Sequence, residues 1–217
     1  MLREIDLDEI SDGKLYGIND MVKAGCNDCK GCFDCCRGMG ESIILDPYDV
    51  FSLTNGLKKT FDELLMANVA LRVVDGLILP YLAMTGDEDK CTFLNDEGRC
   101  SIHKFRPGFC RLFPLGRVYD DEGFHYFLQV NECSYTNRTK VKIKKWIDIQ
   151  ETGRYEQFVK DWHFFQKNLQ NRLNEAQDME LRKKISMLLI KEFYQTAYNA
   201  DDFFNDFCHR IQRFPSF

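Results

Sequence analysis

The stretch Cys26-Asn-Asp-Cys29-Lys-Gly-Cys32-Phe-Asp-Cys35-Cys36-Arg37 holds five of the ten cysteines in the chain. Three successive gaps of two residues separate the first four cysteines. Such gaps allow consecutive thiolates to turn inward onto one soft metal ion or one iron–sulfur cluster. Packing alone does not require this spacing. The stretch therefore predicts a thiolate-bound metal centre around which the rest of the chain folds.

Four further cysteines lie in segments rich in turn-forming residues and could complete the ligand set. The predicted metal ligands are Cys26, Cys29, Cys32, Cys35, Cys36, Cys91, Cys100, Cys110 and Cys133. The tenth cysteine, Cys208, falls on an apolar helical stripe, and we expect it to lie in the core.

Length and composition indicate an ordinary globular protein. The chain has 217 residues, enough for one domain or for one domain with a packed helical extension. Hydrophobic residues make up 44% and charged residues 29%. The net charge of -5 argues against broad binding to nucleic acid or to an acidic membrane, because both favour a basic surface.

The sequence predicts a cytoplasmic protein without a membrane span. No leading segment has the basic-then-apolar pattern of a signal peptide, and the most apolar window, 69–84, is interrupted by Arg72, Asp75 and Pro80. A disulfide framework does not persist in a reducing cytosol. This density of cysteine therefore favours metal or redox chemistry.

Helix signals flank the cysteine stretch. Residues 1–22 lack clean periodicity, so we expect an extended or partly strand-like lead-in. Asp46-Pro47 predicts a helix start, and Asn55-Gly56 predicts its end. The run Thr60-Phe-Asp-Glu63 is a capping box that predicts a second helix.

Hairpin signals follow these helices. The Asp75-Gly76 pair between two apolar runs, 69–74 and 77–81, predicts a β-hairpin with a type I′ turn. A second hairpin is predicted over 115–130, with its tip at 120–123. Residues 91–111 alternate turn signals with cysteines and predict irregular structure folded over the metal.

The chain changes character after Cys133. Apolar residues recur at three- and four-residue steps in three stripes, each typical of one buried helical face. The stripes run over 155–173, 181–193 and 204–211. We therefore predict an α+β protein: a loop-rich, cysteine-bearing metal-binding domain with short β-hairpins and helices at 1–138, and a helical extension packed on it at 139–217.

Two motifs resemble those of a known family. The run Cys29-x2-Cys32-x2-Cys35-Cys36-Arg37 resembles the defining motif of the YkgJ-type CxxCxxCC cysteine-cluster family. The segment from Cys91 to Pro114 is similar to the second signature of that family. The resemblance implies a zinc- or iron-chelating protein, often an iron–sulfur protein. A better-defined branch with a similar pattern is the flagellin lysine N-methylase group. This chain departs from the family in its extra Cys26 and in Phe33, where many members carry glycine.

The cysteine spacing favours an iron–sulfur cluster, most simply of the 4Fe-4S type, over zinc. Zinc prefers two separated cysteine pairs, whereas a Cys-x2-Cys-x2-Cys run with one remote cysteine holds many four-iron clusters. Nine cysteines would suit two four-ligand sites with one left over, or equally one cluster, one zinc ion and a reactive thiol. Adjacent Cys35 and Cys36 are expected to point in different directions, so we do not expect both on one iron.

Arginines gather near the cysteines although the chain is acidic overall. Arg37, Arg106 and Arg111 are predicted to contact the cofactor, where their charge would stabilise a negative cluster and raise its reduction potential. An alternative role is binding of an anionic substrate, or of the carboxylate of a cofactor such as S-adenosylmethionine. We expect His103 to be solvated or locally hydrogen-bonded rather than a ligand.

The leading functional hypothesis is an iron–sulfur protein that transfers electrons, with a redox partner, or assists a modification reaction. A second hypothesis is a non-catalytic zinc module whose helices bind a protein partner. A third is an S-adenosylmethionine-dependent protein lysine methylase. The radical S-adenosylmethionine spacing, Cys-x3-Cys-x2-Cys, does not occur in the sequence.

Overall fold

The computed structural model describes residues 6–27, 32–135 and 137–215. Within these ranges the strands form separate two-stranded antiparallel pairs, connected by helices and irregular segments. The pairs are β1 (Met21–Gly25) with β8 (Thr139–Lys142), β2 (Val69–Val74) with β3 (Leu77–Leu82), β4 (Met84–Thr85) with β5 (Lys90–Cys91), and β6 (Leu115–Tyr119) with β7 (Phe124–Leu128). The structure confirms the predicted α+β class with helices at the C-terminal end.

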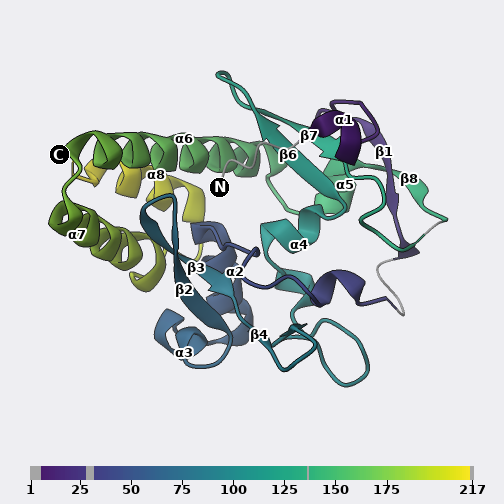
Figure 1. The fold of residues 1–217 in the computed structure, drawn as a ribbon, viewed down its shortest axis with the longest axis horizontal. Coiled ribbons are helices and arrows are strands. Elements are labelled where there is room, and N and C mark those ends of the chain that lie inside the picture. The colour runs from purple at the N-terminus through teal and green to yellow at the C-terminus, as the bar shows by residue number, and fades with distance from the viewer. Residues whose placement is uncertain (1–5, 28–31, 136, 216–217) are drawn as a thin grey trace.

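The helices vary widely in length, and the longest one lies in the C-terminal third (Figure 1). The earlier helices are α1 (Leu7–Ile10), η2 (Asp34–Cys36), α2 (Pro47–Leu57), α3 (Phe61–Leu65), η3 (His103–Phe105), α4 (Gly108–Leu112) and α5 (Ile143–Ile147). They are followed by α6 (Thr152–Ala176), α7 (Met179–Ile190), the π-helical turn η4 (Lys191–Gln195) and α8 (Phe203–Arg213). None of the described helices is long and apolar enough to cross a membrane.

Local capping signals predicted the starts of α2 and α3 correctly. The Asp46 carboxylate accepts a hydrogen bond from the Asp49 N–H at 2.8 Å, and Pro47 occupies the first helical turn. Thr60 and Glu63 form the predicted capping box of α3.

Helix α2 ends later than predicted, because Asn55-Gly56 lies within it and Lys58 takes the left-handed conformation at φ 56°. Gly56 serves close packing: a Cβ at this position would clash with the ring of Phe105.

The predicted hairpin at Asp75-Gly76 is confirmed. These two residues have φ values of 47° and 87°, as a type I′ turn requires, and β2 pairs with β3 in register from Val69–Leu82 to Val74–Leu77. Strand β3 packs on α7, where the Ile78 N–H donates to the buried Ser186 hydroxyl. The second hairpin, β6–β7, also forms where the sequence predicts it.

The C-terminal helices share an aromatic core. The predicted stripe on α6 is buried at Tyr155, Phe158, Trp162, Leu169 and Leu173. The rings of Phe193 and Phe207 are fully buried against the same layer. The Tyr194 hydroxyl donates to the Leu45 carbonyl at 3.1 Å and so joins η4 to the segment before α2.

The prediction that Cys208 lies in the core is wrong, because its side chain is exposed. The buried face of α8 passes through Phe203, Phe207 and Arg210. Arg210 belongs to this face because its guanidinium donates to the carbonyls of Thr196 and Ala197. Cys208, one residue after Phe207, is rotated about 100° away from the core.

The N-terminal lead-in is mostly extended, as predicted, apart from helix α1 and with residues 1–5 outside the described ranges. It bridges to β7 at Tyr16–Tyr126 and then enters β1, which pairs with β8. This pairing carries the chain across the predicted domain boundary at 138/139, and that boundary stays a prediction.

Candidate metal centre

Cysteine side chains line two neighbouring cavities. The nine cysteines in the described part of the chain are free thiols, and Cys29 lies outside the described residues. The larger cavity has a volume of about 60 Å³ and the smaller one about 20 Å³. All the predicted ligands that the structure describes line one cavity or the other.

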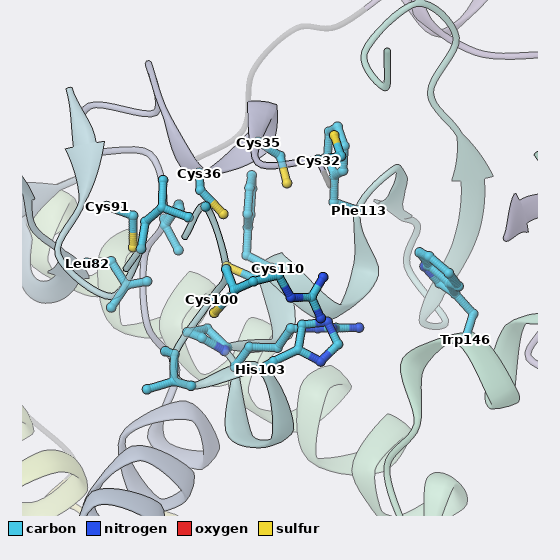
Figure 2. Close-up of a pocket in the computed structure, with 18 residues that line it drawn as sticks. Cys32, Cys35, Cys36, Leu82, Cys91, Cys100, His103, Cys110, Phe113 and Trp146 are labelled. Atoms are coloured by element: carbon cyan, nitrogen blue, oxygen red, sulfur yellow. The ribbon is translucent and has the colours of Figure 1, made fainter. Parts of the chain in front are cut away.

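Six thiols line the larger cavity (Figure 2). They come from the cysteine stretch, from β5, from the following loop and from α4, and are Cys32, Cys35, Cys36, Cys91, Cys100 and Cys110. The lining contains no Asp or Glu side chain among the described residues. A donor set composed of thiols suits a soft metal ion or an iron–sulfur cluster.

The cysteine stretch presents two adjacent thiols through a 3₁₀ turn. Residues Asp34–Cys36 form η2, in which the Cys36 N–H donates to the Phe33 carbonyl at 2.9 Å. Cys35 and Cys36 both line the larger cavity, and the expectation that they do not share one iron stays a prediction. Consecutive side chains on a 3₁₀ turn lie about 120° apart rather than on opposite sides, so both can border one space.

Polar contacts hold the end of the cysteine stretch against the segment that carries Cys91. Arg37 forms an ion pair with Glu88 at 2.5 Å, and its guanidinium lies 4.7 Å from the centre of the Phe33 ring. The Gly40 N–H donates to the Asp89 carboxylate at 2.6 Å. Because β5 begins at the next residue, these contacts place Cys91 beside the stretch.

The loop between Cys91 and Cys100 folds back on itself through backbone hydrogen bonds. The Leu94 N–H donates to the Cys91 carbonyl at 2.9 Å, and Leu94 bridges to Cys100. The Ser101 N–H and hydroxyl both donate to the Phe93 carbonyl. The predicted irregular structure of 91–111 is therefore compact, and both Cys91 and Cys100 line the cavity.

Helix α4 carries Cys110 and is held by Asp49, a residue that the sequence reasoning missed. The Asp49 carboxylate, on α2, accepts hydrogen bonds from the Gly108 N–H at 2.7 Å and from the Asp46 N–H at 3.1 Å. Asp49 is only 3% exposed, and burial raises its pKa to about 6 although both hydrogen bonds act in the opposite direction. The sequence did contain a signal for Asp49: an acidic residue three positions after the helix-capping Asp46 indicates a capping box.

Substitution of Asp49 by alanine is expected to lower the free energy of unfolding by about 2–4 kcal/mol. The change leaves two backbone N–H groups without an acceptor, at about 1–3 kcal/mol for each buried one. Glu63→Ala is the matched control, because Glu63 occupies the same capping-box position in α3 but is exposed. Urea unfolding measures both variants, and an equal effect in the two would contradict the role of burial.

The thiols of the larger cavity influence one another electrostatically. Burial raises the pKa of Cys110, and the charges of Cys91, Cys35 and Cys100 raise it further. Burial, followed by the neighbouring thiols, also raises the pKa of Cys91. A hydrogen bond with Cys36 is the main cause that raises the pKa of Cys35. Cys35, Cys91, Cys100 and Cys110 are therefore coupled electrostatically to one another.

A second group of thiols borders the smaller cavity. Its lining includes Cys26, Cys32, Cys35 and Cys133, with Asp34 beside them. Cys32 and Cys35 also line the larger cavity, so the two cavities are neighbours that share part of the cysteine stretch. The structure thus shows which thiols line which cavity, an assignment that the sequence alone did not allow.

The three predicted cofactor-contacting arginines occupy different environments. Arg106 lines the larger cavity, where its Nη1 contacts the His103 ring and its Nε is buried without a hydrogen-bond partner among the described residues. The Arg111 guanidinium donates to backbone carbonyls, including those of Arg106 and Asp148, and joins α4 to the end of α5. Arg37 is paired with Glu88. Contact of these side chains with a cofactor stays a prediction.

The donor chemistry fits a metal, although the donors stand apart. Among the residues that the structure describes, no three His, Cys, Asp or Glu side chains lie together closely enough to hold an ion. The sulfurs surround the cavities without converging, so metal binding requires them to move inward.

Comparison with protein-family models matches residues 28–155 to the CxxCxxCC family, described as a "putative zinc- or iron-chelating domain". No curated protein and no solved structure matches the chain. The matched range covers more than half of the chain and includes every cysteine that lines the larger cavity. The chain therefore belongs to the CxxCxxCC family, whose description supports binding of zinc or iron.

Proposed function

We propose that the larger cavity holds an iron–sulfur cluster on Cys35, Cys91, Cys100 and Cys110, and that the protein transfers electrons or assists a modification reaction. The observation that carries the proposal is a group of mutually interacting thiols around one cavity without a carboxylate in its described lining. Bound there, the cluster would supply one-electron redox chemistry.

The size of the cavity favours a cluster over a single ion. By the same measure one water needs about 10–15 Å³, so a cavity of about 60 Å³ has room for about four waters. A zinc ion fills only the centre of four sulfurs at about 2.3 Å. An iron–sulfur cluster, which contains several atoms, would fill the larger cavity more completely than a single zinc ion.

The surroundings of the cavity also suit electron exchange. Arg99, Arg106 and His103 contribute to its lining, and positive charge stabilises a negatively charged thiolate cluster. Phe109, also in the lining, is 41% exposed, so the cavity lies close to the surface. A redox partner could therefore approach the cluster on this side.

Purification without oxygen tests the proposal. We expect a brown protein that absorbs at roughly 400 nm, where thiolate-to-iron charge transfer appears, and that contains iron and acid-labile sulfide in equal amounts. A colourless protein with zinc as its only metal would contradict it and favour a structural zinc module. Binding of S-adenosylmethionine, measured by calorimetry on the same sample, would favour the methylase hypothesis.

Replacing Arg106 with glutamine is expected to lower the reduction potential of the cluster. Loss of a positive charge beside the cluster disfavours its reduced, more negative form. The expected shift is on the order of 40 mV, equivalent to about 1 kcal/mol for one electron. Arg213→Gln, on the exposed face of α8, is the matched control and should leave the potential unchanged. An upward shift for Arg106→Gln in a redox titration would be inconsistent with this electrostatic role.

A further inference from the structure

The smaller cavity collects thiols from two distant segments of the chain. Cys26, Cys32 and Cys35 belong to the cysteine stretch, and Cys133 lies in the segment after β7. Pairing of β1 with β8 brings these two segments together, from Met21–Lys142 to Gly25–Thr139. The meeting of Cys133 with the cysteine stretch therefore depends on long-range structure and not on local spacing.

Polar contacts connect these segments at the cavity. Ser134 donates a hydrogen bond to the Asp34 carboxylate, and the Cys32 sulfur lies 3.8 Å from the Ser134 hydroxyl. Asp34 also lines the cavity, beside the three thiols. Three soft sulfurs and one carboxylate make a donor set that zinc accepts.

The segment after β7 has little else to hold it. Asn131, Glu132 and Ser134 are exposed, and none of the described residues from 131 to 135 is buried. Burial of apolar surface therefore contributes little to the order of this segment. A metal cross-link from Cys133 to the cysteine stretch would supply the missing stabilisation.

Without a cation, the surroundings of the smaller cavity disfavour ionisation of its thiols. Burial, followed by the charges of Cys26 and Cys32, raises the pKa of Cys133. Of the positive groups nearby, Arg138 acts in the opposite direction. A divalent cation between the three sulfurs would relieve their mutual repulsion.

Cavity size distinguishes this site from the first. A volume of about 20 Å³ has room for one water by the measure used above, and so for one ion rather than a cluster. As in the larger cavity, the donors line the space without converging. We propose that the smaller cavity is a second, mononuclear zinc site held by Cys26, Cys32, Cys133 and Asp34, separate from the centre at Cys35, Cys91, Cys100 and Cys110.

The second zinc site is an addition to the proposed iron–sulfur function. Metal analysis of single variants can test the zinc site and the cluster separately. Full-length protein is produced with iron and zinc in the medium, purified without oxygen and assayed for both metals. We expect one zinc per chain in the unaltered protein. Cys133→Ser should lower the zinc content at least about tenfold while the absorption near 400 nm persists. Cys100→Ser should remove that absorption and leave the zinc in place.

Cys208→Ser serves as the matched control, because Cys208 is exposed on α8 and lines neither cavity. Unchanged zinc in Cys133→Ser, or joint loss of iron and zinc in both cavity variants, would overturn the second site. Zinc that depends on Cys133 in a protein without iron would support the second site and contradict only the iron–sulfur proposal.

X-ray absorption at the zinc edge of the unaltered protein gives a test that does not depend on a variant folding. We expect about three sulfurs at about 2.3 Å and one oxygen at about 2.0–2.2 Å. Four sulfurs, or oxygen and nitrogen ligands alone, would overturn the assigned ligand set. Asp34→Asn should weaken zinc retention against a chelator, whereas an unchanged rate of loss would remove Asp34 from the site.

Discussion

Replacement of Cys110 by serine is expected to remove the metal of the larger cavity and to destabilise the fold. Cys110 is half-buried, and the charges of Cys91, Cys35 and Cys100 all raise its pKa, so it interacts with each of the other three proposed ligands. Metal binding and folding are coupled where the ligands come from distant segments. We expect at least about tenfold less iron and a loss of about 4 kcal/mol in stability, as for a ligand present at about 1,000 times its Kd.

Iron analysis and chemical unfolding under anaerobic conditions measure both effects. Cys208→Ser is the matched control and should retain its iron and its stability, because its side chain faces solvent. The unaltered protein freed of its iron but still holding its zinc should unfold at the same denaturant concentration as Cys110→Ser. Full iron content in Cys110→Ser would show that this thiol is not a ligand.

A second large effect is expected from Phe207→Ala, which should lower stability by about 3–5 kcal/mol through the cavity that it leaves. The Phe207 ring is fully buried, and its centre lies 4.6 Å from that of Phe158 and 6.0 Å from that of Phe193. Edge-to-face contacts of this kind add to the burial energy.

Phe207→Ala should retain its metal in the molecules that remain folded, because Phe207 lines neither cavity. Met187→Ala is a suitable control on α7, where the side chain is 62% exposed, and should change stability by less than about 0.5 kcal/mol. Thermal unfolding measures the stability of both variants, and metal analysis of the folded fraction measures how much metal each one keeps. Loss of metal from folded Phe207→Ala would mean that the aromatic core positions the ligands.

Local chemistry made several elements predictable. Asp46-Pro47, the Thr60–Glu63 capping box and the Asp75-Gly76 turn each fix a few backbone angles through neighbouring residues, and each forms as expected. The helical stripe of α6 was likewise predictable, because its period is a property of the helix itself.

The grouping of the thiols was not predictable from the sequence. It depends on the pairing of β1 with β8 and on the hydrogen bond from Gly108 to Asp49, which join residues far apart in the chain. The exposure of Cys208 had a similar origin. The apolar stripe of α8 was compatible with burial of Cys208. In the structure, however, the buried face of α8 passes through Phe203, Phe207 and Arg210 and leaves Cys208 exposed.

The pairing of β1 with β8 also has a consequence for biosynthesis. Strand β8 ends at Lys142, so β1 must leave the ribosome well before its partner exists. At about 5–20 residues per second, the 117 residues from Cys26 to Lys142 take about 6–23 s to synthesise. During that interval the early thiols have no completed binding site, and a nascent chain kept in reducing surroundings would reach its metal-loaded form most efficiently.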